Sequence, residues 1–116
     1  EAYYSYDYGN THFLALNSEM YRVLAFWDVL PTAIQFKNWL INDLKNSGGK
    51  FKVAYWHQPP YSKGSHDSDD FWEVFMIAMR EKVVPILEQY GVDLVLCGHS
   101  HVYERSYLIN KHYGKN

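Results

Sequence analysis

Two short apolar segments separated by a helical stretch constrain the fold of this chain more than any other feature. Lys52–Trp56 stops at His57, where Gln-Pro-Pro follows, and Val92–Cys97 stops at Gly98. Between them, apolar residues recur at helical spacing over Phe71–Tyr90. This order predicts two adjacent parallel strands joined by a right-handed crossover. Because both segments are apolar throughout, we expect both faces of the sheet to be covered.

The N-terminal part of the chain predicts a β-hairpin followed by a helix. Tyr3–Tyr8 and Thr11–Asn17 alternate polar and apolar residues on either side of a Gly-Asn step, which is typical of a hairpin. Residues 18–30 have no clear period and are expected to be mostly loop. Thr32 and Gln35 have the spacing of a capping box. The apolar residues that follow at spacings of three and four predict a helix that ends at a Gly-Gly pair.

The remaining elements complete an α/β fold with the predicted order β-β-α-β-α-β-β. Pro85 lies inside the second helical stretch, where it predicts a kink or a fresh helix start. Val102–Ile109 alternates polar and apolar residues and predicts one further strand. The chain has 116 residues, which is enough for one compact domain with its own core.

Charge and composition exclude several classes of function. The net charge is −2 and no basic block is present, which argues against a nucleic-acid partner. No apolar run approaches the roughly 20 residues of a bilayer-spanning helix, so we expect no membrane partner. Cys97 is the only cysteine, so no internal disulfide can form. Its place inside an apolar strand argues against a nucleophilic thiol.

Three histidines follow the two predicted parallel strands and are candidates for a metal site. His57 ends the first strand, and His99 and His101 follow the second. Ligands of open α/β sheets gather at the carboxyl ends of the strands, and imidazole binds zinc, iron and copper well. Residues two apart in an extended segment point the same way, so His99 and His101 can face one site. Each histidine alone is better interpreted as a polar turn residue; the three together predict a metal site.

His66 is the candidate for proton transfer. It lies in a polar loop, and an unperturbed imidazole pKa near 6.5 suits protonation of a leaving alkoxide. The alternative is a solvated loop histidine. His12 falls at the hairpin tip in Gly-Asn-Thr-His, which we interpret as a turn, and we expect His12 and His112 to be ordinary surface residues.

Two segments resemble the calcineurin-like metallophosphoesterases, and the purple acid phosphatase branch in particular. Val92–Arg105 contains Gly-His-Ser-His followed by Tyr-Glu-Arg, which is similar to the last signature of that family. Ala54–Tyr61, with the sequence Ala-Tyr-Trp-His-Gln-Pro-Pro-Tyr, is similar to the preceding single-histidine signature. The resemblance implies a partial β-sandwich flanked by helices, in which residues 1–116 form a C-terminal portion of the catalytic domain and the N-terminal portion is absent.

The resemblance also implies roles for the candidate residues. His57 and His99 would bind a divalent metal and His101 the other metal of a binuclear centre, in which iron is paired with zinc, manganese or iron. His66 would contact the substrate phosphate and protonate the leaving group. The implied reaction is hydrolysis of small-molecule phosphate monoesters by a metal-activated hydroxide. The implied location is secreted or periplasmic, and Arg105 is expected to anchor its loop through an ion pair.

The chain departs from the family by lacking the Asp-x-Gly, Gly-Asp-x-x-Tyr and Gly-Asn-His-Glu blocks. Three neutral imidazoles cannot balance two multivalent cations, so we expect the chain alone to bind metal weakly and to have little phosphatase activity. Half a sandwich also leaves strand edges unpaired, which predicts an oligomer or a missing partner segment. Two alternatives remain open: a non-catalytic interaction module, and a mononuclear zinc protein that uses His57, His99 and His101.

Overall fold

A β-hairpin opens the fold. The computed structural model describes residues 3–106 and 109. Strands β1 (Tyr4–Tyr8) and β2 (Thr11–Ala15) pair antiparallel, as the alternating pattern predicted. Gly9 has a φ of 57°, a left-handed conformation that glycine adopts without a steric penalty. The hairpin prediction is confirmed.

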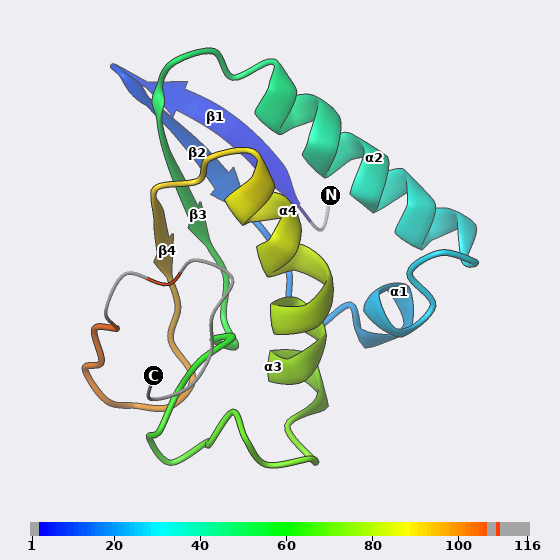
Figure 1. The fold of residues 1–116 in the computed structure, drawn as a ribbon, viewed down its shortest axis with the longest axis vertical. Coiled ribbons are helices and arrows are strands. Elements are labelled where there is room, and N and C mark those ends of the chain that lie inside the picture. Colours follow the sequence, from blue (N-terminus) through cyan, green and yellow to red (C-terminus); the bar gives the residue numbers. More distant parts are fainter. Residues whose placement is uncertain (1–2, 107–108, 110–116) are drawn as a thin grey trace.

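The hairpin continues into a four-stranded mixed sheet with the order β1-β2-β3-β4 (Figure 1). Strand β3 (Phe51–Tyr55) runs parallel to β2, and β4 (Leu94–Leu96) runs parallel to β3. The predicted pair of adjacent parallel strands is therefore present, and the α/β class is confirmed.

The first long helix, α2, covers Pro31–Lys45, but no capping box starts it. Leu30 is the N-cap and makes no side-chain capping bond, so the prediction from Thr32 and Gln35 is wrong. Pro31 occupies the first turn instead, where its fixed φ suits a helix and its missing N–H costs nothing. Residues at helical spacing along one face are buried: Ala33, Phe36, Leu40 and Leu44.

A short helix, α1 (Tyr21–Ala25), lies in the segment that the sequence predicted to be mostly loop. Its five residues are too few to give a periodic pattern, and it is held by packing rather than by propensity. Leu24 of α1 is fully buried, and Trp27 just beyond it is also buried in the core.

The second helical stretch is divided into α3 (Val74–Ala78), a π-helical turn η1 (Met79–Val83) and α4 (Val84–Gln89). The division confirms the break predicted at Pro85, which has no N–H to continue the regular bond pattern. The helical stretch begins at Val74, later than the predicted start at Phe71. Phe71 and Trp72 precede α3 and are exposed instead of packing in the core.

The strand predicted over Val102–Ile109 is wrong for residues 102–106 and 109; residues 107 and 108 lie outside the described part. His99 and His101 both have positive φ values, 71° and 55°, which turn the chain away from the direction of β4. Beyond this turn the chain is held by a neighbouring loop instead of a strand, because Glu104 accepts a hydrogen bond from the Lys63 amide at 2.7 Å.

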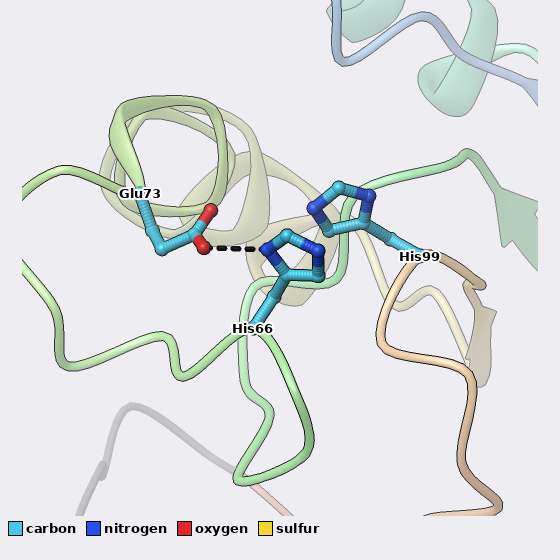
Figure 2. Close-up of side chains that lie close together, drawn as sticks. All are labelled: His66, Glu73 and His99. Atoms are coloured by element: carbon cyan, nitrogen blue, oxygen red, sulfur yellow. Dashed lines mark hydrogen bonds and ion pairs between the residues drawn. The ribbon is translucent and has the colours of Figure 1, made fainter.

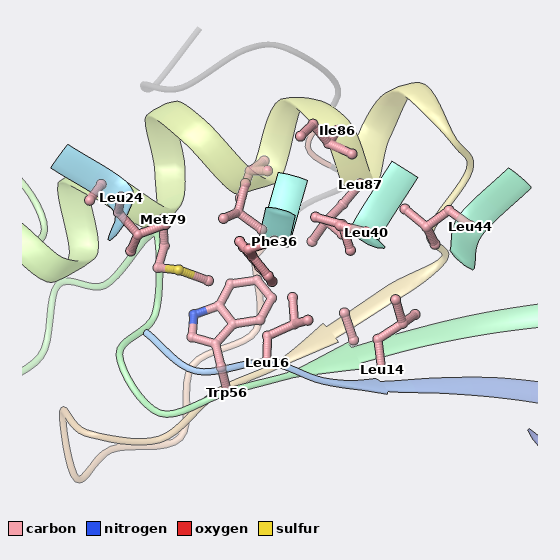
Figure 3. Close-up of a cluster of buried hydrophobic side chains, with 14 of the residues drawn as sticks. Leu14, Leu16, Leu24, Phe36, Leu40, Leu44, Trp56, Met79, Ile86 and Leu87 are labelled. Atoms are coloured by element: carbon pink, nitrogen blue, oxygen red, sulfur yellow. The ribbon is translucent and has the colours of Figure 1, made fainter. Parts of the chain in front are cut away.

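Helices α2 and α4 cover only one face of the sheet (Figure 3). The core lies between this face and the helices, where Leu14, Ala54 and Trp56 of the strand segments meet Phe36 and Leu87. Among residues 3–106 and 109 no helix covers the opposite face, where Tyr4, Phe51 and Leu96 are exposed, so within the described residues the expectation that both faces would be covered is wrong. Among the described residues no helix is both long enough and apolar enough to cross a membrane.

His12 is buried, and the expectation of an ordinary surface histidine is wrong. It lies on the helix-covered face of β2 between two carboxylates. His12 Nδ1 is 2.6 Å from Asp7 Oδ1 on β1, and Nε2 is 2.6 Å from Asp43 Oδ2 on α2. Asp43 also accepts a hydrogen bond from the Ser5 hydroxyl at 2.5 Å. This cluster ties the hairpin to α2.

Candidate functional site

The loops that follow β3 and β4 bring His57 and His99 together. The Gly98 amide donates to the His57 carbonyl at 3.0 Å, which extends the pairing of the two strands beyond their ends. As a result, His99 Nδ1 lies 3.1 Å from His57 Nε2, with ring centroids 4.9 Å apart. Two of the three predicted ligands are therefore in contact.

His66 joins them from the loop between β3 and α3. Its ring centroid is 3.9 Å from that of His99. His66 Nδ1 is 2.7 Å from Glu73 Oε1, and Glu73 is the N-cap residue of α3 (Figure 2). One potential ligand atom from each of His66, Glu73 and His99 lies within 4.8 Å of the others. Glu73 was not among the residues that the sequence singled out.

His101 stands apart from this group. Its side chain is exposed, and within residues 3–106 no hydrogen bond joins it to the other three histidines. The alternation expected of an extended Gly-His-Ser-His segment does not apply, because both histidines have left-handed backbones.

The surroundings of His99 favour a neutral ring. Burial lowers the pKa of His99, and the charges of His66 and His57 lower it further. A neutral imidazole is the form that binds a metal.

Serine side chains hold the loop that carries His66 against the loop that carries His99. The Ser62 hydroxyl lies 2.6 Å from Glu104 Oε2 and 2.8 Å from the Ser100 hydroxyl. Ser100 is almost fully buried, and its hydroxyl lies 3.1 Å from the His66 carbonyl oxygen. Ser65 donates to the Ser100 carbonyl at 2.8 Å. Ser100, which the sequence pattern treats as a spacer between histidines, therefore fixes the His66 loop beside His99.

Gly64 is the glycine that this contact requires. A Cβ at Gly64 would lie 2.7 Å from Val102 Cγ2 and 2.9 Å from Ser100 Cβ, which is too close for any side chain. At Gly98 a Cβ would lie 3.7 Å from His57 Nδ1, an ordinary van der Waals contact. Gly98, which adjoins the histidine signature, is thus the less constrained of the two.

Arg80 of η1 holds the base of the His66 loop. Its guanidinium donates to the carbonyls of Pro60 at 3.0 Å and Ser68 at 2.9 Å. The role expected of Arg105 is wrong for the described part of the chain, where Arg105 makes no ion pair. Glu104 anchors that loop through Ser62 and the Lys63 amide.

Cys97 lies just beyond the end of β4 and is exposed, so its predicted place inside a strand is wrong. Protein atoms that displace water from the sulfur raise the pKa of the Cys97 thiol to about 12. A thiol in this state is a poor nucleophile, as expected.

The residues of the site fit one divalent cation. Imidazole nitrogens and a carboxylate oxygen are the ligands that zinc and related metals prefer. Two ligand atoms of a tetrahedral zinc ion lie about 3.4 Å apart, given bonds of about 2.1 Å. The ligand atoms of His66, Glu73 and His99, which lie within 4.8 Å of one another, therefore need to approach by up to about 1.4 Å. One carboxylate does not supply the charge that a pair of multivalent cations requires.

Known proteins resemble this chain along most of its length. The family model of calcineurin-like phosphoesterases matches residues 3–103. Purple acid phosphatase 23 of Arabidopsis thaliana is 35% identical over 106 residues, which cover 89% of this chain and 20% of the relative. Purple acid phosphatase 15 is 34% identical over 107 residues, covering 90% of this chain and 18% of the relative. Another similar protein, at 33% identity over 110 residues, is named probable inactive purple acid phosphatase 9. The chain spans about one fifth of the length of these relatives.

Proposed function

Because the chain belongs to the calcineurin-like phosphoesterase family, we propose that it provides part of a site that hydrolyses small-molecule phosphate monoesters with the help of bound metal ions. The observation that supports this function best is the meeting of His57, His66 and His99 where two adjacent parallel strands end. Glu73 adds a carboxylate to the same group.

Within this proposal, His57 and His99 hold a divalent metal and His101 contributes to the other metal. The metals are iron paired with zinc, manganese or iron, as the resemblance to the purple acid phosphatases implies. Lewis-acid activation of a water molecule is the chemistry that such ions supply. We extend the proposal to a secreted or periplasmic location, which rests on that resemblance alone.

His66 is proposed to give a proton to the departing alkoxide. Its Nδ1–H donates to Glu73, so Nε2 is the nitrogen that remains for the substrate. When both nitrogens are protonated, Glu73 stabilises the charged ring and Nε2–H is available to the ester oxygen. Glu73 is then a positioning residue, because it acts through His66.

The test measures hydrolysis and metal binding by the chain itself. With added Zn²⁺ or Fe²⁺ we expect slow phosphate release from p-nitrophenyl phosphate, and we expect chelation or His99→Asn to abolish it. His66→Asn should slow an alkyl phosphate more than p-nitrophenyl phosphate, because p-nitrophenolate leaves without a proton. Release that persists in His99→Asn or after chelation would contradict the proposal. Two tightly held metals per chain with rapid turnover would contradict the expected weakness of the chain alone.

A mononuclear site is the second candidate, and the grouping of His66, Glu73 and His99 favours it. This set differs from His57, His99 and His101, which the sequence indicated for a single zinc. Calorimetric titration with Zn²⁺ separates the two candidates. If Glu73 is a ligand, Glu73→Gln weakens zinc binding at least tenfold; if it only positions His66, the affinity is nearly unchanged and the alkyl phosphate rate falls.

A further inference from the structure

Glu104, in the Tyr-Glu-Arg segment after the histidine signature, holds the loop that carries His66 with both of its carboxylate oxygens. Oε1 accepts a hydrogen bond from the Lys63 amide at 2.7 Å, and Oε2 accepts one from the Ser62 hydroxyl at 2.6 Å. Glu104 is exposed, whereas Ser62 is buried. The contact therefore runs from the surface into the interior of the protein.

From Ser62 a chain of hydroxyl groups leads to the backbone of His66. The Ser62 and Ser100 hydroxyls lie 2.8 Å apart, and the Ser100 hydroxyl donates to the His66 carbonyl at 3.1 Å. Ser100 directly follows His99 in the sequence, and the His66 and His99 rings are 3.9 Å apart. The chain of hydroxyls therefore sets how the His66 loop lies against His99.

The number of available hydrogens decides how this chain is bonded. A carboxylate only accepts, so Glu104 takes the single hydroxyl hydrogen of Ser62. The Ser62 oxygen then accepts from the Gly64 amide at 3.1 Å and from the Ser100 hydroxyl. The hydrogen of Ser100 is consequently shared between the Ser62 oxygen and the His66 carbonyl. All members of the chain are bonded, and neighbouring bonds in such a network strengthen one another.

Other contacts fasten the same loop in different places. Arg80 of η1 binds carbonyls at the base of the loop, and Lys63 forms an ion pair within it to Asp67 at 2.9 Å. Neither of these contacts involves the segment after β4. The Ser65 hydroxyl adds a bond to the Ser100 carbonyl at 2.8 Å. Loss of the carboxylate is therefore expected to loosen the loop rather than to release it.

We propose that Glu104 is a positioning residue for His66 and acts through the Ser62 and Ser100 hydroxyls. This inference rests on the proposed function, in which His66 gives a proton to the departing alkoxide. Misplacement of a reacting group by about 1 Å can cost roughly 100-fold in rate. Loosening the loop therefore slows an ester whose leaving group needs a proton more than one whose leaving group departs without it.

Glu104→Ala and Glu104→Gln, compared on an alkyl phosphate and on p-nitrophenyl phosphate with added Zn²⁺, test the proposal. We expect Glu104→Ala to lower the alkyl phosphate rate about tenfold more than the p-nitrophenyl phosphate rate. Glu104→Gln should keep the wild-type ratio, because its amide nitrogen donates to Ser62 and reverses the chain. The Ser100 hydrogen then goes entirely to the His66 carbonyl. Glu81→Ala is the matched control, because it removes an exposed glutamate of η1 outside both loops.

Hydrogen exchange of the Gly64 and Ser68 amides, followed by NMR, examines the chain without metal or substrate. The Gly64 amide donates to the Ser62 hydroxyl oxygen, and the Ser68 amide donates to the Ser62 carbonyl at 3.0 Å. We expect both amides to exchange about tenfold faster in Glu104→Ala and at the wild-type rate in Glu104→Gln and Glu81→Ala. Unchanged exchange in Glu104→Ala would overturn the proposal.

The two measurements separate this proposal from the function on which it rests. If neither ester is hydrolysed, the proposed function fails; faster amide exchange in Glu104→Ala would still support the hold of Glu104 on the His66 loop. Equal losses on both esters in Glu104→Ala would show a merely structural role, and a Glu104→Gln defect as large as that of Glu104→Ala would show a role of charge. Either result would overturn the proposal. Circular dichroism of each variant shows that it folds.

Discussion

The cluster of His12, Asp7 and Asp43 gives the most quantitative prediction, through the variant His12→Gln. Both imidazole nitrogens lie 2.6 Å from carboxylate oxygens, so both must carry a hydrogen and the ring is charged. Burial alone would lower the pKa of His12, but the hydrogen bonds to Asp43 and Asp7 outweigh it and raise the pKa above 6.5. Glutamine cannot carry this charge or reach both carboxylates.

The size of the stability loss in His12→Gln depends on how exposed the carboxylates of Asp43 and Asp7 are. A hydrogen bond to a charged group contributes about 1.5–3 kcal/mol when it is shielded from water. Asp43 is only 17% exposed and is expected to give a contribution of this size. Asp7 is 49% exposed, so solvent screening leaves it the smaller share. We therefore expect His12→Gln to lower the free energy of unfolding by about 1.5–3 kcal/mol, mostly through the lost bond to Asp43.

The stability that His12 contributes changes with pH in a direction that follows from its pKa. The pKa of His12 is raised on folding, so its contribution is complete below pH 6.5 and is lost as the pH rises through the folded value. The hydrogen bonds from His12 and Lys50 lower the pKa of Asp7, so its contribution is lost as the pH falls through that lowered value. Urea unfolding should therefore show a larger difference between wild type and His12→Gln near about pH 6 than near about pH 9.

Two carboxamide variants are the controls for this reasoning. Asp43→Asn should cost more stability than Asp7→Asn, because its carboxylate is the more buried. Equal losses from these two variants, or a His12→Gln difference that does not change with pH, would refute the charged-histidine interpretation.

Three further predictions concern the candidate site. Gly64→Ala should lower the free energy of unfolding by about 1–3 kcal/mol through overpacking, as measured by urea unfolding, and should weaken Zn²⁺ binding, as measured by calorimetry. Gly49→Ala is the control, because a Cβ at Gly49 meets nothing within 4 Å, and it should change neither quantity. Ser100→Ala should lower the free energy of unfolding by about 1–3 kcal/mol, because the His66 carbonyl loses the hydroxyl that donates to it and the loop contact loses its bond to Ser62. Glu73→Gln should lower the rate with an alkyl phosphate more than with p-nitrophenyl phosphate, and equal effects on both would contradict a positioning role.

Local patterns were sufficient to predict the elements that depend on local physics. The hairpin follows from a glycine turn between alternating segments, and the break at Pro85 follows from a missing N–H. The strand predicted from Val102 onward failed for a non-local reason. A strand needs a neighbour, and the positive φ values of His99 and His101 direct the chain to the Ser62 loop instead.

The candidate site also contains residues that local sequence could identify and residues that it could not. His57, His66 and His99 could be identified from strand ends and from family resemblance, because each occupies a recognisable place in the sequence. Glu73 and Gly64 could not be identified, because their importance lies in contacts with residues that come from other segments. His12 was misjudged since its position at a hairpin tip says nothing about Asp43, which reaches it from α2.

Glu73 changes the charge balance that the histidines alone imply. Three neutral imidazoles offer no negative charge, whereas His66, Glu73 and His99 together offer one carboxylate within 4.8 Å of two nitrogens. That set matches the ligand types of a single zinc site, two histidines and one glutamate. A second cation would add further positive charge without an added carboxylate, and Coulomb repulsion between two divalent ions is severe at short range. The metal stoichiometry of the chain alone is therefore expected to be one, whichever role Glu73 takes.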